Sequence, residues 1–263
     1  MNKNNEQLFH AARTGNVALL EDVIRKGVDV QTRNSNGETA LHQAARAGQI
    51  PTMAALLEHR ADLRGQDRAG QEPLHVAVEE GHPQAIAFLV SRGADIHKLH
   101  NLSCSNIAFG KVSALHWAAV CSQVDSVTAL LDAGADVNAP SSFGWQALHY
   151  ATAAADGPPP IIDALVARGA DINAADPDGN TPFHLINQLK NEAPGWGVLG
   201  NIDREQRAHD TIDSLLAHGA DPLFLNRAGL RPLEKDGTPE ELSRIDQHIL
   251  HRQEPHATRR RML

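Results

Sequence analysis

Residues 37–45 read Gly-Glu-Thr-Ala-Leu-His-Gln-Ala-Ala, and the Leu41-His42 pair within them returns along the chain. The further occurrences are Leu74-His75, Leu115-His116, Leu148-His149 and Phe183-His184. Their histidines are spaced by 33, 41, 33 and 35 residues. A period near 33 residues predicts a stack of repeats, because one short unit cannot bury its apolar face and neighbouring units must cover it.

A second marker runs in step with the histidines. It reads Gly-Ala-Asp from Gly93, Gly134, Gly169 and Gly219, with the variants Gly-Val-Asp from Gly27 and Arg-Ala-Asp from Arg60. Between the markers, segments such as Ile50 to Leu57 carry apolar residues at helical spacing. The glycines follow these segments, where a left-handed cap needs no side chain, and Thr39 and Thr181 precede the first helices as N-caps. Each period therefore predicts two short helices and a turn.

The phrases that carry these markers resemble the ankyrin repeat over roughly residues 6–235. They include residues 37–45, Ser-Ala-Leu-His-Trp-Ala-Ala at 113–119, Leu-Leu-Asp-Ala-Gly-Ala-Asp-Val-Asn-Ala at 130–139 and Asn-Thr-Pro-Phe-His at 180–184. The resemblance implies an all-α fold, an ankyrin-repeat α-solenoid of stacked helix–turn–helix units with short β-turn or finger connections. It also implies that the recurring histidine bonds backbone groups of the neighbouring turn. The same resemblance says little about function, because the family's usual role is to hold another protein.

The register predicts one elongated domain over residues 1–250, followed by a flexible basic tail at 251–263. Atypical end units are expected because a solenoid must present polar caps to solvent. The units are an N-cap at 4–33, repeats at 34–66, 67–98, 112–139, 140–174 and 175–225, and a C-cap at 226–250.

Three departures from the period mark insertions. Eight extra residues fall in 99–111 and should form an enlarged finger, two fall in the helix–helix turn at 155–160, and seventeen fall in 188–207. Insertions in repeat arrays map to loops on one face, often the binding face. The alternative is a tolerated surface loop, because lengthening a loop costs little entropy.

Composition excludes several classes of function. The formal net charge of −8 does not favour a nucleic-acid partner, and no apolar run approaches the ~20 residues of a membrane helix. The N-terminus is polar, with no apolar segment behind it, so we expect no classical secretion signal. Only two cysteines are present, so we expect no disulfide framework. We expect a cytoplasmic monomer with no membrane or nucleic-acid partner; secretion by a route that reads no N-terminal signal stays open.

No catalytic motif is present, and we expect no catalytic, cofactor or metal site. A metal ion needs ligands that converge on one point, whereas the repeated histidines should lie in a row, one repeat apart. His97 and His100, like His248 and His251, make two-ligand patterns without a third ligand in view, and we interpret both as incidental. An enzyme whose activity lies in the 188–207 insertion is the alternative of a different class.

The resemblance places the exposed concave face on the finger tips and on the fourth and fifth positions after each histidine. Phe143 and Trp145 fall on a finger tip, where they either meet a partner or pack on the neighbouring finger. Trp117 and Tyr150 directly follow a histidine, where half-buried structural residues are expected. The predicted partner-binding residues are Phe143, Trp145, Trp196, Arg46, Arg68, Gln71, Glu79 and Glu80.

Asn138 and Asn173 stand in the sequences Asp-Val-Asn-Ala and Asp-Ile-Asn-Ala. In animal cells, asparagines in such motifs resemble targets of an asparaginyl hydroxylase. We expect them to form turns here, because asparagine side chains bond the backbone of their own turn.

The sequence as a whole predicts a non-enzymatic interaction scaffold that binds a protein partner on its concave finger and inner-helix surface. One alternative is an inhibitor or immunity-type protein that blocks a single enzyme or toxin. The other is a secreted effector or adaptor that acts on host proteins.

Overall fold

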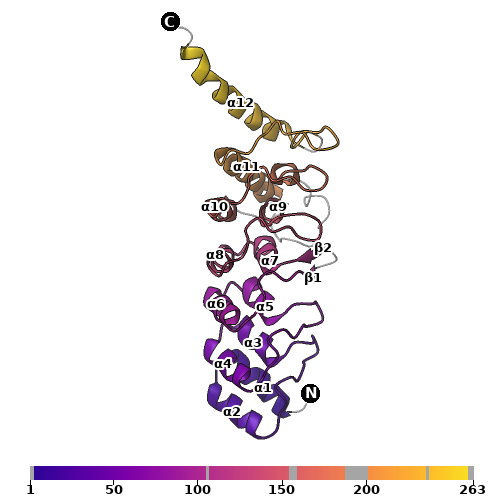
Figure 1. Cartoon of the computed structure of the whole chain (residues 1–263), viewed down its shortest axis with the longest axis vertical. Coiled ribbons are helices and arrows are strands. Elements are labelled where there is room, and N and C mark those ends of the chain that lie inside the picture. Colours follow the sequence, from indigo (N-terminus) through magenta and orange to yellow (C-terminus); the bar gives the residue numbers. More distant parts are fainter. Residues whose placement is uncertain (1–2, 105–106, 154–158, 187–200, 235–236, 260–263) are drawn as a thin grey trace. The chain divides into compact units, whose positions relative to one another are not determined.

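The computed structural model describes residues 3–104, 107–153, 159–186, 201–234 and 237–259 (Figure 1). Its contacts divide the chain into two compact units, residues 1–143 and residues 144–263. The division falls within the repeat expected at 140–174.

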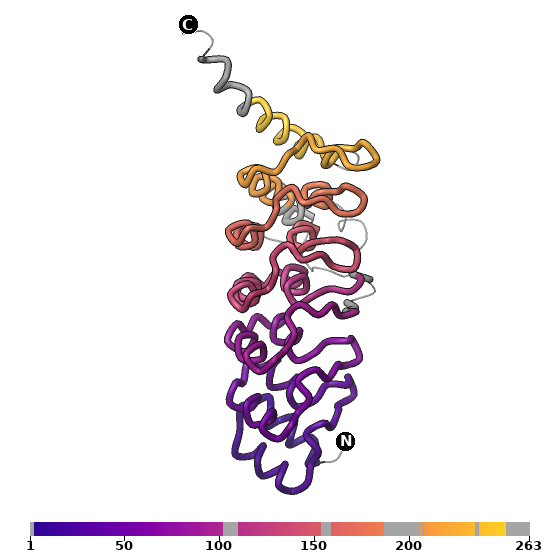
Figure 2. The backbone as a smooth tube through the Cα atoms, in the orientation of Figure 1, coloured from indigo at the N-terminus to yellow at the C-terminus, as the bar shows by residue number. Residues whose placement is uncertain are grey.

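The first unit consists of paired helices in two layers. One helix of each pair (α1, α3, α5 and α7) packs on the next such helix, and the second helices (α2, α4, α6 and α8) form the other layer (Figure 1). The connections between pairs, which we call fingers, project to one side of this unit (Figure 2). The predicted all-α repeat fold is confirmed. The bounds are α1 Lys3–Thr14, α2 Val17–Arg25, α3 Ala40–Arg46, α4 Ile50–Glu58, α5 Pro73–Glu79, α6 Pro83–Ser91, α7 Ala114–Val120 and α8 Val124–Asp132.

The histidine motif starts the first helices α3, α5 and α7. In α3 the N-cap is Thr39, as predicted, and its backbone N–H donates to Nδ1 of His42 at 3.1 Å, while its hydroxyl lies 2.8 Å from the same nitrogen. Ser113 and His116 repeat this arrangement at the start of α7. A helix leaves its first N–H groups without partners inside the helix, so this local bonding explains why the helix begins there.

The second helices end where the chain turns left-handed. Gly93 and Gly134 have φ values of 96° and 93°, and an added Cβ would meet no heavy atom within 4 Å at either one. The backbone angle, rather than a lack of space, therefore requires glycine at these caps.

The insertion at 99–111 forms a β-hairpin. Strands β1 (His100–Cys104) and β2 (Ile107–Val112) pair antiparallel, with His100 opposite Val112. The hairpin lies against the preceding finger, because a Cβ added to Gly70 would lie 2.6 Å from the Asn101 carbonyl oxygen.

The second unit contains α9 (Ala147–Ala153), α10 (Pro159–Ala167), the 3₁₀ helix η1 (Pro182–Leu185), α11 (Asn201–Ala217) and α12 (Pro239–Arg259). Helix α9 packs on η1, and α10 packs on both α9 and α11. Helix α12 packs on α11.

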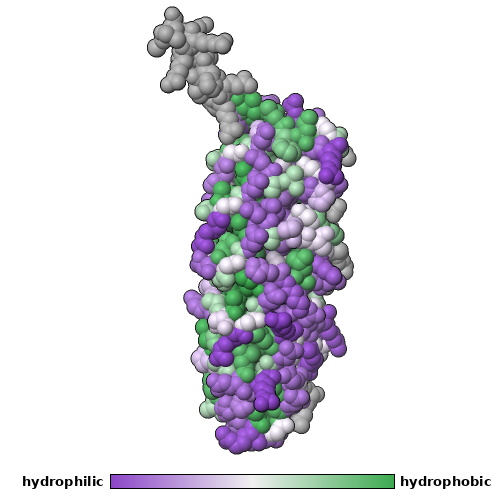
Figure 3. Space-filling model, viewed as in Figure 1, coloured by the Kyte–Doolittle hydropathy of each residue, from purple (hydrophilic) through white to green (hydrophobic). Residues whose placement is uncertain are grey.

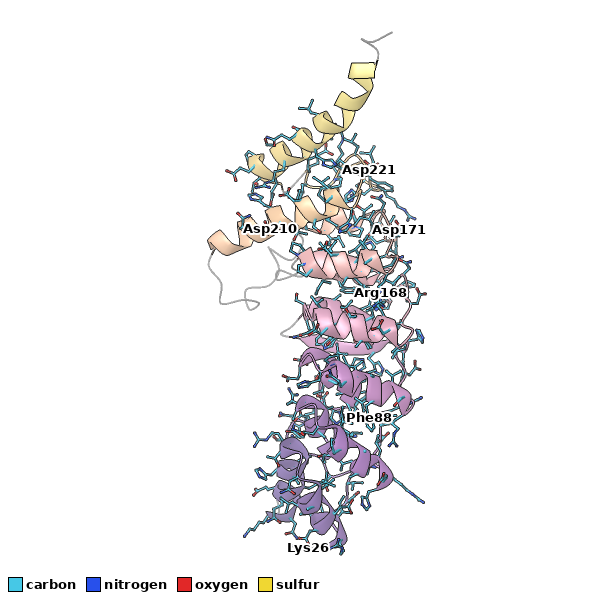
Figure 4. All side chains as sticks on the ribbon, turned by 90° about the vertical axis from the view of Figure 1, so that its left-hand side faces the viewer. Lys26, Phe88, Arg168, Asp171, Asp210 and Asp221 are labelled. Carbon is cyan, nitrogen blue, oxygen red and sulfur yellow. The ribbon has the colours of Figure 1, made fainter. Side chains whose placement is uncertain are left out.

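The turns that follow α10 and α11 are linked through asparagine. Asp171 and Asp221 lie along one edge of this unit (Figure 4) and accept N–H bonds from residues two positions later in their own turns. The Asn173 side chain accepts from the N–H of Asp221 at 2.8 Å and donates to the Gly219 carbonyl at 3.4 Å. Asn173 is thus a turn residue that also joins two repeats.

Two expectations about the second unit concern its insertion and its tail. Residues 187–200, which include Trp196, and residues 154–158 lie outside the described residues. The remainder of the 188–207 insertion belongs to α11. Helix α12 continues to Arg259, through the segment that was expected to be a flexible tail.

Two aromatic residues are buried more deeply than the sequence suggested. Trp117 in α7 and Tyr150 in α9 expose 2% and 1% of their surface. They directly follow the motif histidines and belong to the core of their respective units, which identifies them as structural residues.

Candidate functional site

The predicted binding residues of the first unit include a connected set of charges. Arg46, in the last turn of α3, bonds Glu38 of its own finger at 2.8 Å and Glu80 of the next repeat at 2.5 Å. We call these three residues the Arg46 network. Figure 3 shows that hydrophilic residues gather over the finger side of this unit. The network ties two repeats together and fixes the direction of its side chains.

Glu38 is the buried centre of the network, with 4% of its surface exposed. Burial alone would raise the pKa of its carboxyl, but hydrogen bonds from Asn34 and Arg46 outweigh burial and hold the pKa below its ordinary value. Asn34 and Gln43 also bond the second oxygen, at 2.7 and 2.8 Å. Glu38 therefore stays ionised and anchors Arg46. This role of Glu38 was not predicted from the sequence.

The other predicted binding residues on the polar side of this unit differ in their exposure to solvent. Arg68 and Glu80 are exposed and Glu79 is half-buried. Gln71 is only 8% exposed, and its amide donates to Glu79 at 2.6 Å. Gln71 thus orients Glu79 from beneath rather than presenting its own side chain.

Phe143 is an exposed apolar residue of the first unit, with 49% of its surface accessible. One edge of its ring lies against β2, because a Cβ added to Gly110 would sit 3.0 Å from the ring. Ser142 joins the same strand through its bonds to Lys111, at 2.6 and 3.0 Å. The finger tip is therefore held by the hairpin, and the other side of the Phe143 ring remains available.

Trp145 belongs to the second unit and is half-buried. Its indole N–H donates to Asp176 at 3.1 Å, and its ring meets Tyr150 edge-on at 5.2 Å. Packing on the neighbouring finger was one of the two expectations for this residue. These contacts give Trp145 a structural role within its unit.

Four motif histidines share one pattern of bonding. Each ring uses Nε2 to bond a carbonyl oxygen of the following finger, at 3.0 to 3.3 Å. The pairs are His42 with Gln71, His116 with Ala139, His149 with Asn180 and His184 with Leu230. These four are scaffold residues, as the resemblance implied.

His75 departs from this pattern. The hairpin follows its repeat, and the Nε2 atom of His75 has no hydrogen-bond partner among the described residues. Its ring instead meets the His100 ring of β1 edge-on, with the centroids 4.4 Å apart. Glu72, which occupies the N-cap position of Thr39 and Ser113, completes a histidine–carboxylate cluster of Glu72, His75 and His100.

The cluster is buried, and burial dominates its electrostatics. Its three residues expose 1 to 2% of their surface. Burial lowers the pKa of the His75 imidazole to about 3 and also lowers the pKa of His100. Burial raises the pKa of Glu72, although Lys98 at 3.3 Å acts in the opposite direction. The sequence analysis did not predict that these three residues converge. Two features could have indicated it: Glu72 stands where other repeats have a Ser or Thr cap, and His100 lies in the insertion that follows.

Acidification from about pH 7.5 to about pH 5.5 is expected to lower the free energy of unfolding through the scaffold histidines. Burial holds the pKa of His42, His149 and His184 below 6.5. The unfolded chain then binds more protons below about pH 6.5, so this stability is present above that pH and is lost as the pH falls. Urea titrations across the range should show a slope of at most about 1.4 kcal/mol per pH unit for each histidine.

His149→Gln is the control for this pH dependence. It should reduce the slope of unfolding free energy against pH, whatever it does to stability at neutral pH. Equal slopes for the two proteins would contradict the assignment of the effect to buried neutral histidines.

Comparison with known proteins places the chain. The family model described as ankyrin repeats (3 copies) matches residues 8–100 and 98–176. Protein phosphatase 1 regulatory subunit 27 of Mus musculus is 39% identical over 75 residues, 28% of this chain and 47% of that protein. Ankyrin repeat and SOCS box protein 6 of Homo sapiens is 40% identical over 101 residues, 35% of this chain and 23% of that protein.

The mitochondrial disaggregase of Bos taurus is 33% identical over 144 residues, 47% of this chain and 21% of that protein. The chain thus matches about half or less of the length of these curated relatives. The family model, in contrast, covers more than half of the chain and agrees with the helix pairs and the motif histidines. On this ground, the chain belongs to the ankyrin repeat family.

Proposed function

We propose that this chain is a non-catalytic module that binds a protein partner on the fingers and first helices of its first unit. Ankyrin repeats generally mediate protein–protein interaction. The observation that carries the proposal for this surface is the Arg46 network, whose charged side chains are already fixed in direction. Preorganised side chains lose little entropy when a partner binds, so more of the contact energy appears as affinity.

The charge of this surface suggests the chemistry of the partner. The Arg46 network holds two carboxylates, those of Glu38 and Glu80, against one guanidinium, which leaves it a net charge of −1. Glu79, which directly precedes Glu80 in the chain, adds a further half-buried carboxylate. We infer a partner that presents basic or amide groups here. Complementary charges of this kind raise the association rate and select among partners.

Phe143 supplies an apolar contact at another point of the same unit. Aromatic residues are often the hot spots of an interface, where substitution by alanine causes the largest loss of binding free energy. The hairpin holds this finger tip, so a partner would meet it in a defined position.

The relatives support a role without catalysis, since one of them is named as a regulatory subunit of a phosphatase. In the part of the chain that the structure describes, no helix is long and apolar enough to cross a membrane. A partner in the form of another protein is consistent with both findings.

Affinity capture from a lysate of the source organism tests the proposal. The tagged wild-type protein should retain a partner that Glu79→Lys/Glu80→Lys loses, because the substitution reverses the charge of the surface. Glu58→Lys is the control: it makes one such charge reversal at an exposed position at the end of α4, in the other helix layer. The captured protein is then purified, and its affinity for the three proteins is measured by calorimetry in buffer with EDTA.

The expected result is a loss of at least about tenfold in affinity for the double variant and no change for Glu58→Lys. Circular dichroism establishes that both variants are folded. Equal affinities for all three proteins would place the partner elsewhere on the chain and refute the surface proposed here.

A further inference from the structure

We propose that Glu72, His75 and His100 form a binding site for one divalent transition-metal ion, with zinc as the best fit. Within the described part of the chain, no other group of three or more His, Cys, Asp or Glu side chains lies close enough together to hold a metal ion. Each offers one ligand atom, and these atoms all lie within 4.8 Å of one another. The site belongs wholly to the first unit and is separate from the surface assigned to a partner.

The potential ligand atoms are buried and lack hydrogen-bond partners. These atoms are Oε2 of Glu72 and the Nε2 atoms of His75 and His100. Buried polar side-chain atoms in proteins nearly always have a partner, so three orphaned atoms at one point call for a ligand. His100 Nε2 lies 3.4 Å from the other carboxylate oxygen of Glu72, too far for a strong hydrogen bond.

The fold creates the site through the inserted hairpin. In the other repeats with a motif histidine, Nε2 bonds a carbonyl of the following finger. In the finger that follows α5 and α6, strand β1 stands instead (Figure 1), and its first residue is His100. Glu72 is available because it replaces the hydroxyl residue that caps the neighbouring first helices, Thr39 in α3 and Ser113 in α7.

The neighbouring side chains bear on the ligand geometry. The amide of Gln66 lies 3.0 Å from Nδ1 of His100. The amide nitrogen faces the ring, and a half-turn of the amide brings its oxygen to Nδ1 instead. The oxygen then accepts Nδ1–H and leaves Nε2 to bind metal, a common arrangement behind metal-bound histidines. His75 must likewise carry its proton on Nδ1, which ends its long bond of 3.2 Å from the Glu72 N–H.

Two further adjustments accompany metal binding. Lys98, whose ammonium lies 3.3 Å from Glu72, must turn away from the cation, and its side chain is 44% exposed, so solvent is within its reach. The ligand atoms must also approach to roughly 3.3 Å from one another, the spacing set by zinc–ligand bonds of about 2.0 to 2.1 Å. Rotation of the Glu72 carboxylate about its side-chain bonds supplies part of this closure.

The donor set selects the class of metal. Two imidazoles and one carboxylate suit zinc and its neighbours among the transition metals, whereas calcium and magnesium prefer oxygen ligands only. Three protein ligands leave one tetrahedral position open for water. The ion would tie β1 to the start of α5 and so hold the hairpin on its repeat.

Metal-free protein, prepared with EDTA and then freed of the chelator, tests the site with Zn²⁺ and Co²⁺ alone. Wild type should take up one tight equivalent of Zn²⁺ and gain about 5 °C or more in its unfolding midpoint. Co²⁺ in the same site should give the intense visible absorption of a four-coordinate ion, which Zn²⁺ removes by competition. His100→Ala and Glu72→Gln should lose the stabilisation and the absorption.

His97→Ala is the matched control, since His97 is an exposed histidine three residues before His100. It should behave as wild type and so account for weak binding by surface histidines. Circular dichroism establishes folding; His100 lies outside the helices, and Glu72→Gln provides a second variant should His100→Ala unfold. The proposal is overturned if wild type shows neither effect, or if wild type and both cluster variants respond to Zn²⁺ equally.

Discussion

Replacement of Trp117 by alanine is expected to lower the free energy of unfolding by about 3 to 5 kcal/mol, the range for deleting a large buried aromatic side chain. Trp117 stands in α7 and exposes 2% of its surface. Helix α7 packs on both α5 and α8, so the void would open between two repeats as well as within one. Urea unfolding followed by circular dichroism measures the loss.

Phe143→Ala is the control for this loss, because it also removes an aromatic ring from the first unit but from a position that is 49% exposed. It should cost less than about 1 kcal/mol, and Trp117→Phe should cost less than half of the alanine change. Similar losses for Trp117→Ala and Phe143→Ala would show that the α7 core is not packed as described.

The repeated features of the fold could be predicted because each unit makes the same contacts with the next. The His42 motif and the Gly93 cap recur at a fixed interval, and each is explained by bonds within a few residues or to the adjacent finger. A period in the sequence therefore encodes both the helices and their stacking.

Features that occur once could not be read in the same way. The convergence of His75 and His100 depends on the path of the hairpin, which is set by contacts such as the close approach of Asn101 to Gly70. The insertion occurs in one finger only, so the repeat pattern does not predict its course. The spacing of the histidines alone predicted a row with no point of convergence.

The contacts of single side chains on the proposed binding surface were also not predictable from the repeat register. The repeat register named Arg46 and Glu80 only as separate binding residues. It gave no sign that a salt bridge joins them or that Glu38 is buried and bonds Arg46. Gln71 was expected to be exposed and is instead buried against Glu79. A register assigns a position to a face, whereas burial depends on which long side chains cover one another.

His116→Ala is expected to lower the free energy of unfolding by about 2 to 4 kcal/mol, since it removes two bonds to buried backbone groups and leaves a void. The imidazole accepts from the N–H of Ser113 and bonds the carbonyl of Ala139, both at 3.0 Å. The first bond starts α7, and the second holds the next finger. Urea unfolding in buffer with EDTA measures the effect.

His75→Ala in the same buffer separates the two bonds. His75 has the same 1% exposure and also accepts from the N–H of its N-cap, at 3.2 Å. It lacks the contact that His116 makes with the Ser113 hydroxyl, and its Nε2 reaches no finger carbonyl. Its loss should therefore be smaller than that of His116 by about 1 kcal/mol, the net value of one hydrogen bond. If His75→Ala proved as costly as His116→Ala, the finger carbonyl would contribute nothing to stability, and the histidine row would act only by starting the helices.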